Sequence, residues 1–73
     1  MSRNAVKTEI TGKVWKVTAS KGQMLAEDEP IVILESMKME IPVPVPLSCT
    51  IIEIIVAEGD TVTEGDIIAY IGI

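Results

Sequence analysis

A lysine flanked by two methionines stands near the middle of the chain, in the run ESMKM at residues 35–39. Residues 22–73 contain ten acidic residues and one basic residue, and that residue is Lys38. A lysine amine is a nucleophile, and enzymes use it to form Schiff bases when burial or neighbouring cations lower its pKa. Glu35, Glu40 and the acidic surroundings should instead favour the ammonium form. The isolated cation therefore indicates a specific role. A Schiff-base enzyme is a disfavoured alternative, and a solvated surface lysine is the ordinary one.

The residues around this lysine predict a β-hairpin with the lysine at its tip. The run IVILESMKMEIPV is apolar at both ends, so we expect the turn near Met37 and Lys38. Tight hairpins favour Asn-Gly or Asp-Gly because their central residues often need positive φ, and Met-Lys provides neither residue type. Places where a local rule fails are more often functional or strained than ordinary ones.

The sequence on the two sides of this segment indicates two copies of one unit. Residues 11–34 align with residues 48–71 at an offset of 37, which matches Gly22 with Gly59. Each copy predicts a strand, a glycine turn, a short strand, an acidic turn and a further strand. Chance matching of apolar residues is the alternative. If a pseudo-twofold axis relates the copies, Lys38 and the chain termini should lie at opposite ends of the domain.

Alternating prolines follow the expected turn. In the run MEIPVPVP, Pro42, Pro44 and Pro46 occupy every second position, and alternate residues of a strand point their N–H groups to the same side. One side of this strand therefore lacks donors, which predicts an edge strand protected against further pairing. A proline-rich ligand for an aromatic groove is the alternative, but the run has no P-x-x-P spacing.

Length and composition restrict the fold to one small domain. The chain has 73 residues, 48% hydrophobic and 3% aromatic, so its core must be aliphatic. The abundance of Ile and Val favours strands. An acidic net charge of −5 argues against nucleic-acid binding. The absence of histidine and the single cysteine argue against a zinc site. No run reaches a membrane-spanning length and no signal peptide is visible, so we expect a cytoplasmic protein.

The central motif resembles the E-A-M-K-M attachment motif of the biotinyl domains, a branch of the biotin/lipoyl attachment family, at Glu35, Ser36, Met37, Lys38 and Met39. The resemblance covers residues 8–72 and is strongest to small biotin/lipoyl attachment proteins and to carrier subunits of acyl-CoA carboxylases. It implies an all-β fold: a flattened β barrel or sandwich of two four-stranded sheets with a pseudo-twofold internal repeat, the barrel-sandwich hybrid.

The same resemblance implies a role for each residue of the motif. Lys38 matches the position that carries biotin through an amide bond. Met37 and Met39 match residues that a biotin protein ligase recognises, and Glu35 and Ser36 complete the motif, with Ser36 in place of the commoner Ala. The implied function is a non-catalytic biotin carboxyl carrier, as in acetyl-CoA carboxylase. Its partners would be biotin carboxylase and carboxyltransferase subunits.

Two alternatives remain beside this interpretation. A lipoyl carrier would attach lipoate to the same lysine through a lipoate ligase, although lipoyl domains usually carry an acid and a small residue around D-K-A. A structural β module without a cofactor is the other alternative. In either case we expect a monomer in isolation, with residues 1–7 as an N-terminal tail and residues 8–73 as the domain.

Two positions depart from the expected turn pattern. Cys49 stands where the family usually has Gly, and Asp28 stands where the second copy has Gly65. Both departures put the local turn geometry in doubt. For Cys49 we predict a small buried hydrophobe and not a reactive thiol, because no cationic residue lies near it in the sequence.

Overall fold

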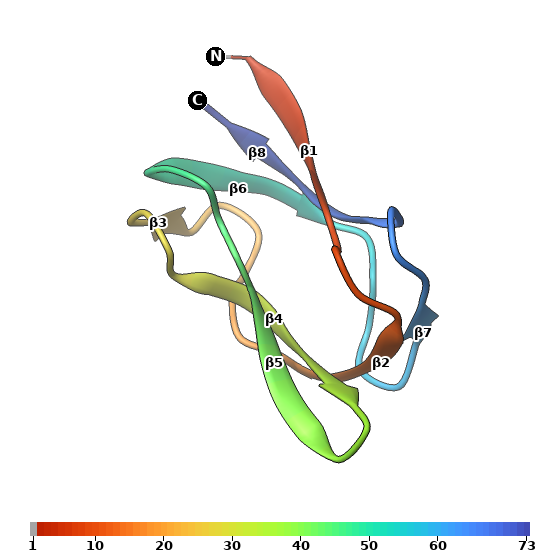
Figure 1. Ribbon diagram of the computed structural model, residues 1–73. Helices are drawn as coiled ribbons and strands as arrows, with labels where there is room; N and C mark the ends of the chain where they lie inside the picture. Colours follow the sequence, from red (N-terminus) through yellow and green to blue (C-terminus); the bar gives the residue numbers. More distant parts are fainter. Residues whose placement is uncertain (1) are drawn as a thin grey trace.

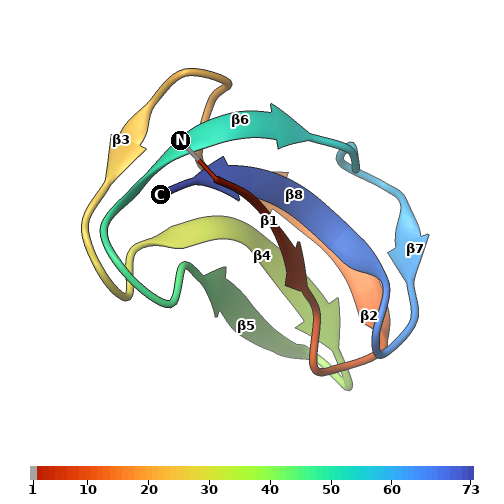
Figure 2. The ribbon, with the colours of Figure 1, turned by 90° about the horizontal axis from the view of Figure 1, so that it is seen from above.

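The computed structural model describes residues 2–73, which form two four-stranded antiparallel sheets. One sheet has the strand order β1-β8-β6-β3 and the other has the order β5-β4-β2-β7. Figures 1 and 2 show the two curved sheets facing each other, and the predicted all-β sandwich is confirmed. The strands are β1 (Arg3–Lys7), β2 (Gly12–Val17), β3 (Met24–Leu25), β4 (Pro30–Ser36), β5 (Met39–Pro44), β6 (Cys49–Ile54), β7 (Thr61–Val62) and β8 (Ile67–Gly72).

An aliphatic core fills the space between the sheets. Its largest fully buried side chains come from both copies of the unit and include Ile31, Leu34, Ile51, Ile68 and Ile71. Burial of one such side chain contributes about 1.5 to 3 kcal/mol. The expected core without aromatic residues is therefore confirmed, and it lies in the body of the sandwich.

The two-copy organisation predicted from the sequence is confirmed strand by strand. The offset of 37 maps β2 onto β6 and β3 onto β7 residue for residue, and it maps β4 onto β8. The turn hydrogen bonds follow the same rule: Gly22 N–H donates to the Ile51 carbonyl at 2.7 Å, and Gly59 N–H donates to the Val14 carbonyl at 2.8 Å. Both glycines have positive φ, 86° and 95°. The turn glycines are thus equivalent in conformation as well as in sequence.

The chain termini and the β4–β5 hairpin lie at opposite ends of the molecule, as the repeat predicts (Figure 1). The domain measures 36 × 18 × 17 Å, so these ends are separated along its long axis. At the terminal end, Ser2 and Ile73 exchange two backbone hydrogen bonds of 3.1 Å. The hairpin tip is therefore the part of the domain farthest from its termini.

The predicted N-terminal tail was wrong for residues 3–7. These residues form β1, which pairs with β8 and places Val6 in the core with 7% exposure. The physical reason is the pseudo-symmetry: β1 is the counterpart of β5, and each covers one edge of the central strand pair in its sheet. The remaining part of the tail includes residue 1, which lies outside the described residues.

Strand β5 is an edge strand, as the alternating prolines predict. Among residues 2–73 it pairs only with β4. The three prolines of the run are exposed, while Val43 in the strand and Val45 just after it are buried. The Val45 N–H donates inward to the Glu29 carbonyl at 2.9 Å. The strand thus directs its donors toward its partner and presents proline nitrogens, which cannot donate, on its outer side.

Candidate functional site

The β4–β5 hairpin presents Lys38 on a turn of two residues. The strands stay in register up to the pair Ser36 and Met39, so only Met37 and Lys38 form the loop. Their φ angles are 51° and 65°, the sign pattern of a type I′ turn. The predicted tip position is therefore confirmed.

This turn stores backbone strain at the lysine. A residue other than glycine in the left-handed region costs about 1 to 3 kcal/mol, and the surrounding structure must maintain that conformation. Among residues 2–73, the non-glycine residues with positive φ are Asp28, Met37 and Lys38. The turn chemistry that is unusual in the sequence thus corresponds to two adjacent strained residues.

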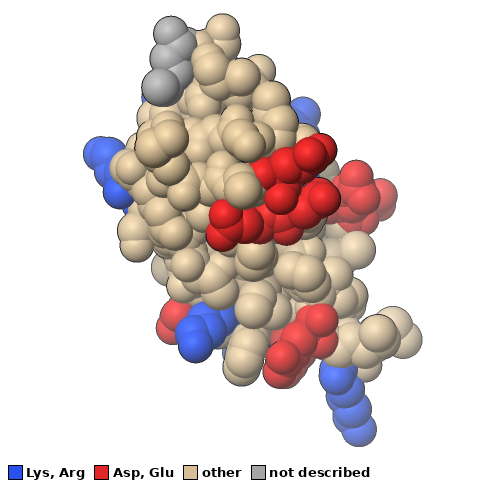
Figure 3. Space-filling view, turned by 90° about the vertical axis from the view of Figure 1, so that its left-hand side faces the viewer, with Lys and Arg blue, Asp and Glu red and all other residues tan. Residues whose placement is uncertain are grey.

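The side chains at the tip extend into solvent. Met37 is 92% exposed and Met39 is 63% exposed, so neither fills a gap in the core. Lys38 is exposed and, within the described part of the chain, makes neither an ion pair nor a side-chain hydrogen bond. Figure 3 shows a basic side chain projecting at the lower end, where the hairpin turns, with acidic side chains above it. The amine is therefore accessible from solvent.

Glu35 and Ser36 complete the predicted site at the end of β4. Glu35 is exposed and lies opposite Glu40 on β5, whereas Ser36 is half-buried beneath the turn. All five residues of the motif are therefore contiguous on one hairpin end. The two carboxylates also place negative charge on both strands below the lysine.

Gly12 lies against the end of β4 just below the turn, a contact that the sequence does not predict by itself. A Cβ atom at Gly12 would lie 2.8 Å from the backbone oxygen of Glu35 and 3.4 Å from the Ser36 Cβ. Strand β2 can therefore approach β4 closely only because position 12 has no side chain. A glycine within a predicted strand is the signal that could have identified this close approach.

The two departures from the turn pattern are compatible with the fold. Asp28 has a φ of 71° and adopts the same left-handed conformation as its counterpart Gly65, with a φ of 92°. Cys49 is 8% exposed, which confirms the buried hydrophobe and leaves no accessible thiol. Burial raises the pKa of the Cys49 thiol, so the thiolate is disfavoured.

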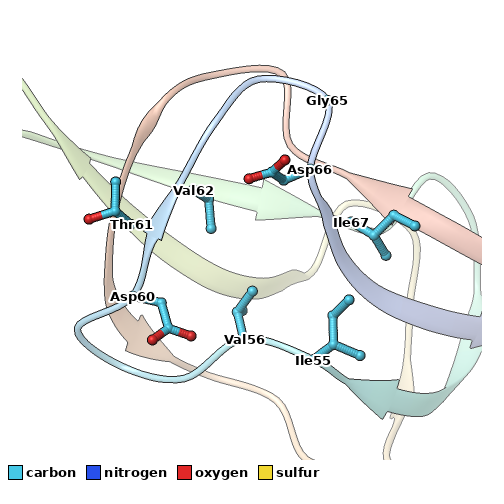
Figure 4. Close-up of a pocket in the computed structure, with 8 residues that line it drawn as sticks. All are labelled: Ile55, Val56, Asp60, Thr61, Val62, Gly65, Asp66 and Ile67. Atoms are coloured by element: carbon cyan, nitrogen blue, oxygen red, sulfur yellow. The ribbon is translucent and has the colours of Figure 1, made fainter.

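A surface pocket away from the tip is formed by the turns on either side of β7. It has a volume of about 490 Å³ and is lined by residues between β6 and β8 (Figure 4). Its carboxylates already accept hydrogen bonds: Asp60 from Ala57 N–H and Asp66 from Thr63 N–H, both at 2.8 Å. Residues 2–73 contain no cluster of side chains that could hold a metal ion, and no helix long and apolar enough to span a membrane. The hairpin tip is therefore the candidate site.

The fold and the tip define a small all-β domain with an exposed lysine on a two-residue turn at one end. The family model described as "Biotin-requiring enzyme" matches residues 4–71. The chain therefore belongs to the biotin/lipoyl attachment family, as its central motif indicates.

Curated relatives and solved structures agree with this membership. The chain is 40% identical over 63 residues to a biotin/lipoyl attachment protein of Bacillus subtilis, covering 86% of each chain. It is 39% identical over 66 residues to a biotinylated protein TB7.3 homolog of Mycobacterium leprae, covering 90% of this chain and 93% of the relative.

Two further matches are domains of larger proteins. A stretch of 56 residues, 75% of this chain and 13% of the relative, is 49% identical to a dihydrolipoyllysine-residue succinyltransferase component from Bartonella vinsonii. The crystal structure of Kluyveromyces lactis urea carboxylase superposes with a TM-score of 0.90 at 31% identity. That superposition covers 97% of this chain and 6% of the other. The chain is thus similar to a part of a succinyltransferase component and to a part of a carboxylase.

Proposed function

We propose that this chain is a biotin carboxyl carrier with biotin joined to Nζ of Lys38. The observation that supports the proposal is the exposed, unpaired amine on a two-residue turn between two exposed methionines. A ligase would supply biotin as an activated acyl group. The amine attacks the acyl carbon, the amide bond forms, the activating group leaves, and the ammonium proton passes to the ligase.

The shape of the domain suits a carrier that visits two active sites. The tip lies at one end of the 36 Å axis, so a partner can enclose Lys38 without contacting the terminal end of the sandwich. Tethering keeps the cofactor at a high effective concentration at both sites. In this proposal a biotin carboxylase carboxylates the biotin, a carboxyltransferase removes the carboxyl group, and the chain itself catalyses neither step.

The proposal is tested by intact mass and streptavidin binding after incubation with purified biotin ligase, biotin and ATP. The wild type should gain one biotin. Lys38→Arg should gain none, because a guanidinium is not a usable acyl acceptor. Lys21→Arg is the matched control, since Lys21 is also an exposed lysine on a turn. Biotin on the Lys38→Arg variant would refute the assignment.

A lipoyl carrier is the second candidate, favoured by the 49% identity to the succinyltransferase component. The methionines oppose it, because lipoyl domains usually carry an acid before the lysine and this chain has Met37 there. An acid at that position would add a charge to a surface that the biotin ligase must desolvate. Met37→Asp with Met39→Ala should slow biotinylation at least tenfold, about 1.4 kcal/mol of barrier. A wild-type chain that accepted lipoate faster than biotin would make the lipoyl carrier the better assignment.

A further inference from the structure

The described sulfur atoms differ sharply in their accessibility. Three methionines are exposed: Met24 at 80%, Met37 at 92% and Met39 at 63%. The one cysteine, Cys49, is buried in the core. Oxidants in solution therefore reach thioethers and not the thiol, and two of these three thioethers flank Lys38.

We propose that Met37 and Met39 form a peroxide-sensitive modification site that controls the loading of Lys38. Oxidation of the two thioethers to sulfoxides blocks biotinylation, and reduction of the sulfoxides restores it. The proposal rests on the proposed function, because loading by a ligase is the step that it controls.

The reaction needs a peroxide as its only co-reactant. The thioether sulfur attacks one peroxide oxygen, the O–O bond breaks and an S–O bond forms. With hydrogen peroxide the second oxygen leaves as water. Each sulfur loses two electrons and the peroxide gains them. Sulfoxide reductases reverse the change, so the modification can be removed without replacing the protein.

The position of the methionines explains why oxidation would act on recognition and leave the fold intact. Neither side chain belongs to the core, so a sulfoxide oxygen at the tip remains in water in the free domain. A ligase must enclose the tip to bring the Lys38 amine to its acyl donor. That contact removes water from a sulfoxide that has no partner in a groove fitted to a thioether, and such burial is unfavourable.

Met24 provides an internal control for this effect. It is as accessible as the tip methionines, but it lies on β3 in the other sheet, away from the hairpin tip (Figure 1). Its oxidation should therefore accompany that of Met37 and Met39 without contributing to the loss of loading.

The test measures biotinylation rates before and after treatment of the apo-protein with hydrogen peroxide. Peptide mass spectrometry locates the added oxygen atoms, and circular dichroism checks the fold. We expect the oxidised wild type and the oxidised Met24→Leu variant to load at least tenfold more slowly than their untreated forms. The Met37→Leu/Met39→Leu double variant keeps apolar side chains of similar volume but has no thioether at the tip. Its biotinylation rate after peroxide treatment should be less than twofold below the rate of its own untreated form.

Treatment of the oxidised wild type with sulfoxide reductases of both stereospecificities should restore the original rate. The inference is overturned if the oxidised wild type loads at the untreated rate, or if the double variant is inhibited as strongly as the wild type. An inhibition that persists after sulfoxide reduction overturns it as well. If the untreated wild type is not biotinylated at all, the proposed function fails first. The two failures are therefore distinguishable.

Discussion

The strain at the hairpin tip should reverse the usual order of stability of alanine and glycine. At an ordinary strand position, alanine is the more stabilising residue, because glycine loses more conformational freedom on folding. Lys38 has a φ of 65°, where glycine is unstrained. Lys38→Gly should therefore be more stable than Lys38→Ala, although both variants lose the same amine.

The expected difference follows from two opposing contributions. The left-handed conformation penalises alanine by about 1 to 2 kcal/mol. The smaller entropy of its unfolded chain favours alanine by about 0.4 to 1 kcal/mol. The penalty is the larger contribution, so Lys38→Gly should exceed Lys38→Ala by about 1 kcal/mol in free energy of unfolding. For a chain of this size that difference shifts the thermal midpoint by about 4 to 8 °C.

Urea titration monitored by circular dichroism measures this difference, with Glu40 as the matched control. Glu40 is exposed on the same hairpin, and it is not among the residues with positive φ. Glu40→Ala should be more stable than Glu40→Gly by about 0.5 to 1 kcal/mol. The reasoning about strain would be refuted if alanine were equal or superior to glycine at position 38 while the Glu40 pair behaved as expected.

Three further variants test other parts of the structure. Gly12→Ala should destabilise the fold by about 1 to 3 kcal/mol in urea titration, because its Cβ would lie 2.8 Å from the Glu35 backbone oxygen; an unchanged midpoint would contradict the close approach. Above about pH 9 the wild type should lose stability more steeply than Cys49→Ala, because burial raises the pKa of the Cys49 thiol and the unfolded chain releases that proton at lower pH. Parallel pH profiles would argue against this linkage. Arg3→Ala should cost less than about 1 kcal/mol, and high salt should shrink the difference, because the 3.0 Å pair with Glu53 joins two half-exposed side chains. A larger, salt-independent loss would show another role for Arg3.

The repeat made most of the fold predictable from the sequence. Gly22 and Gly59 mark equivalent turns because both need the left-handed conformation, and the apolar positions at the same offset mark equivalent strands. The alternating prolines identified the edge strand for a local reason, since proline cannot donate a hydrogen bond. The position of Lys38 at a tip followed from the same patterns.

Features that depend on tertiary contacts were not visible in the sequence. Strand β1 has polar residues at most positions and one buried residue, Val6, so its own pattern indicates a tail. It becomes a strand because β8 offers it an edge. A glycine in a strand can signal a close approach, but the sequence around Gly12 does not reveal that the Glu35 backbone oxygen is the neighbour that excludes a side chain there. In both cases a partner distant in the sequence determines the outcome.

The two ends of the sandwich are built alike, and the hairpin end carries a strained turn. Ser36 and Met39 close the hairpin at the tip, and their counterparts Ile73 and Ser2 pair at the other end. At the tip the chain passes from Ser36 to Met39 through Met37 and Lys38, and the positive φ angles of these two residues make the turn strained. Because β4 and β5 continue from the tip into buried positions such as Leu34 and Val43, core packing can maintain the strained turn. The tip can therefore consist of solvent-exposed residues that the core does not need.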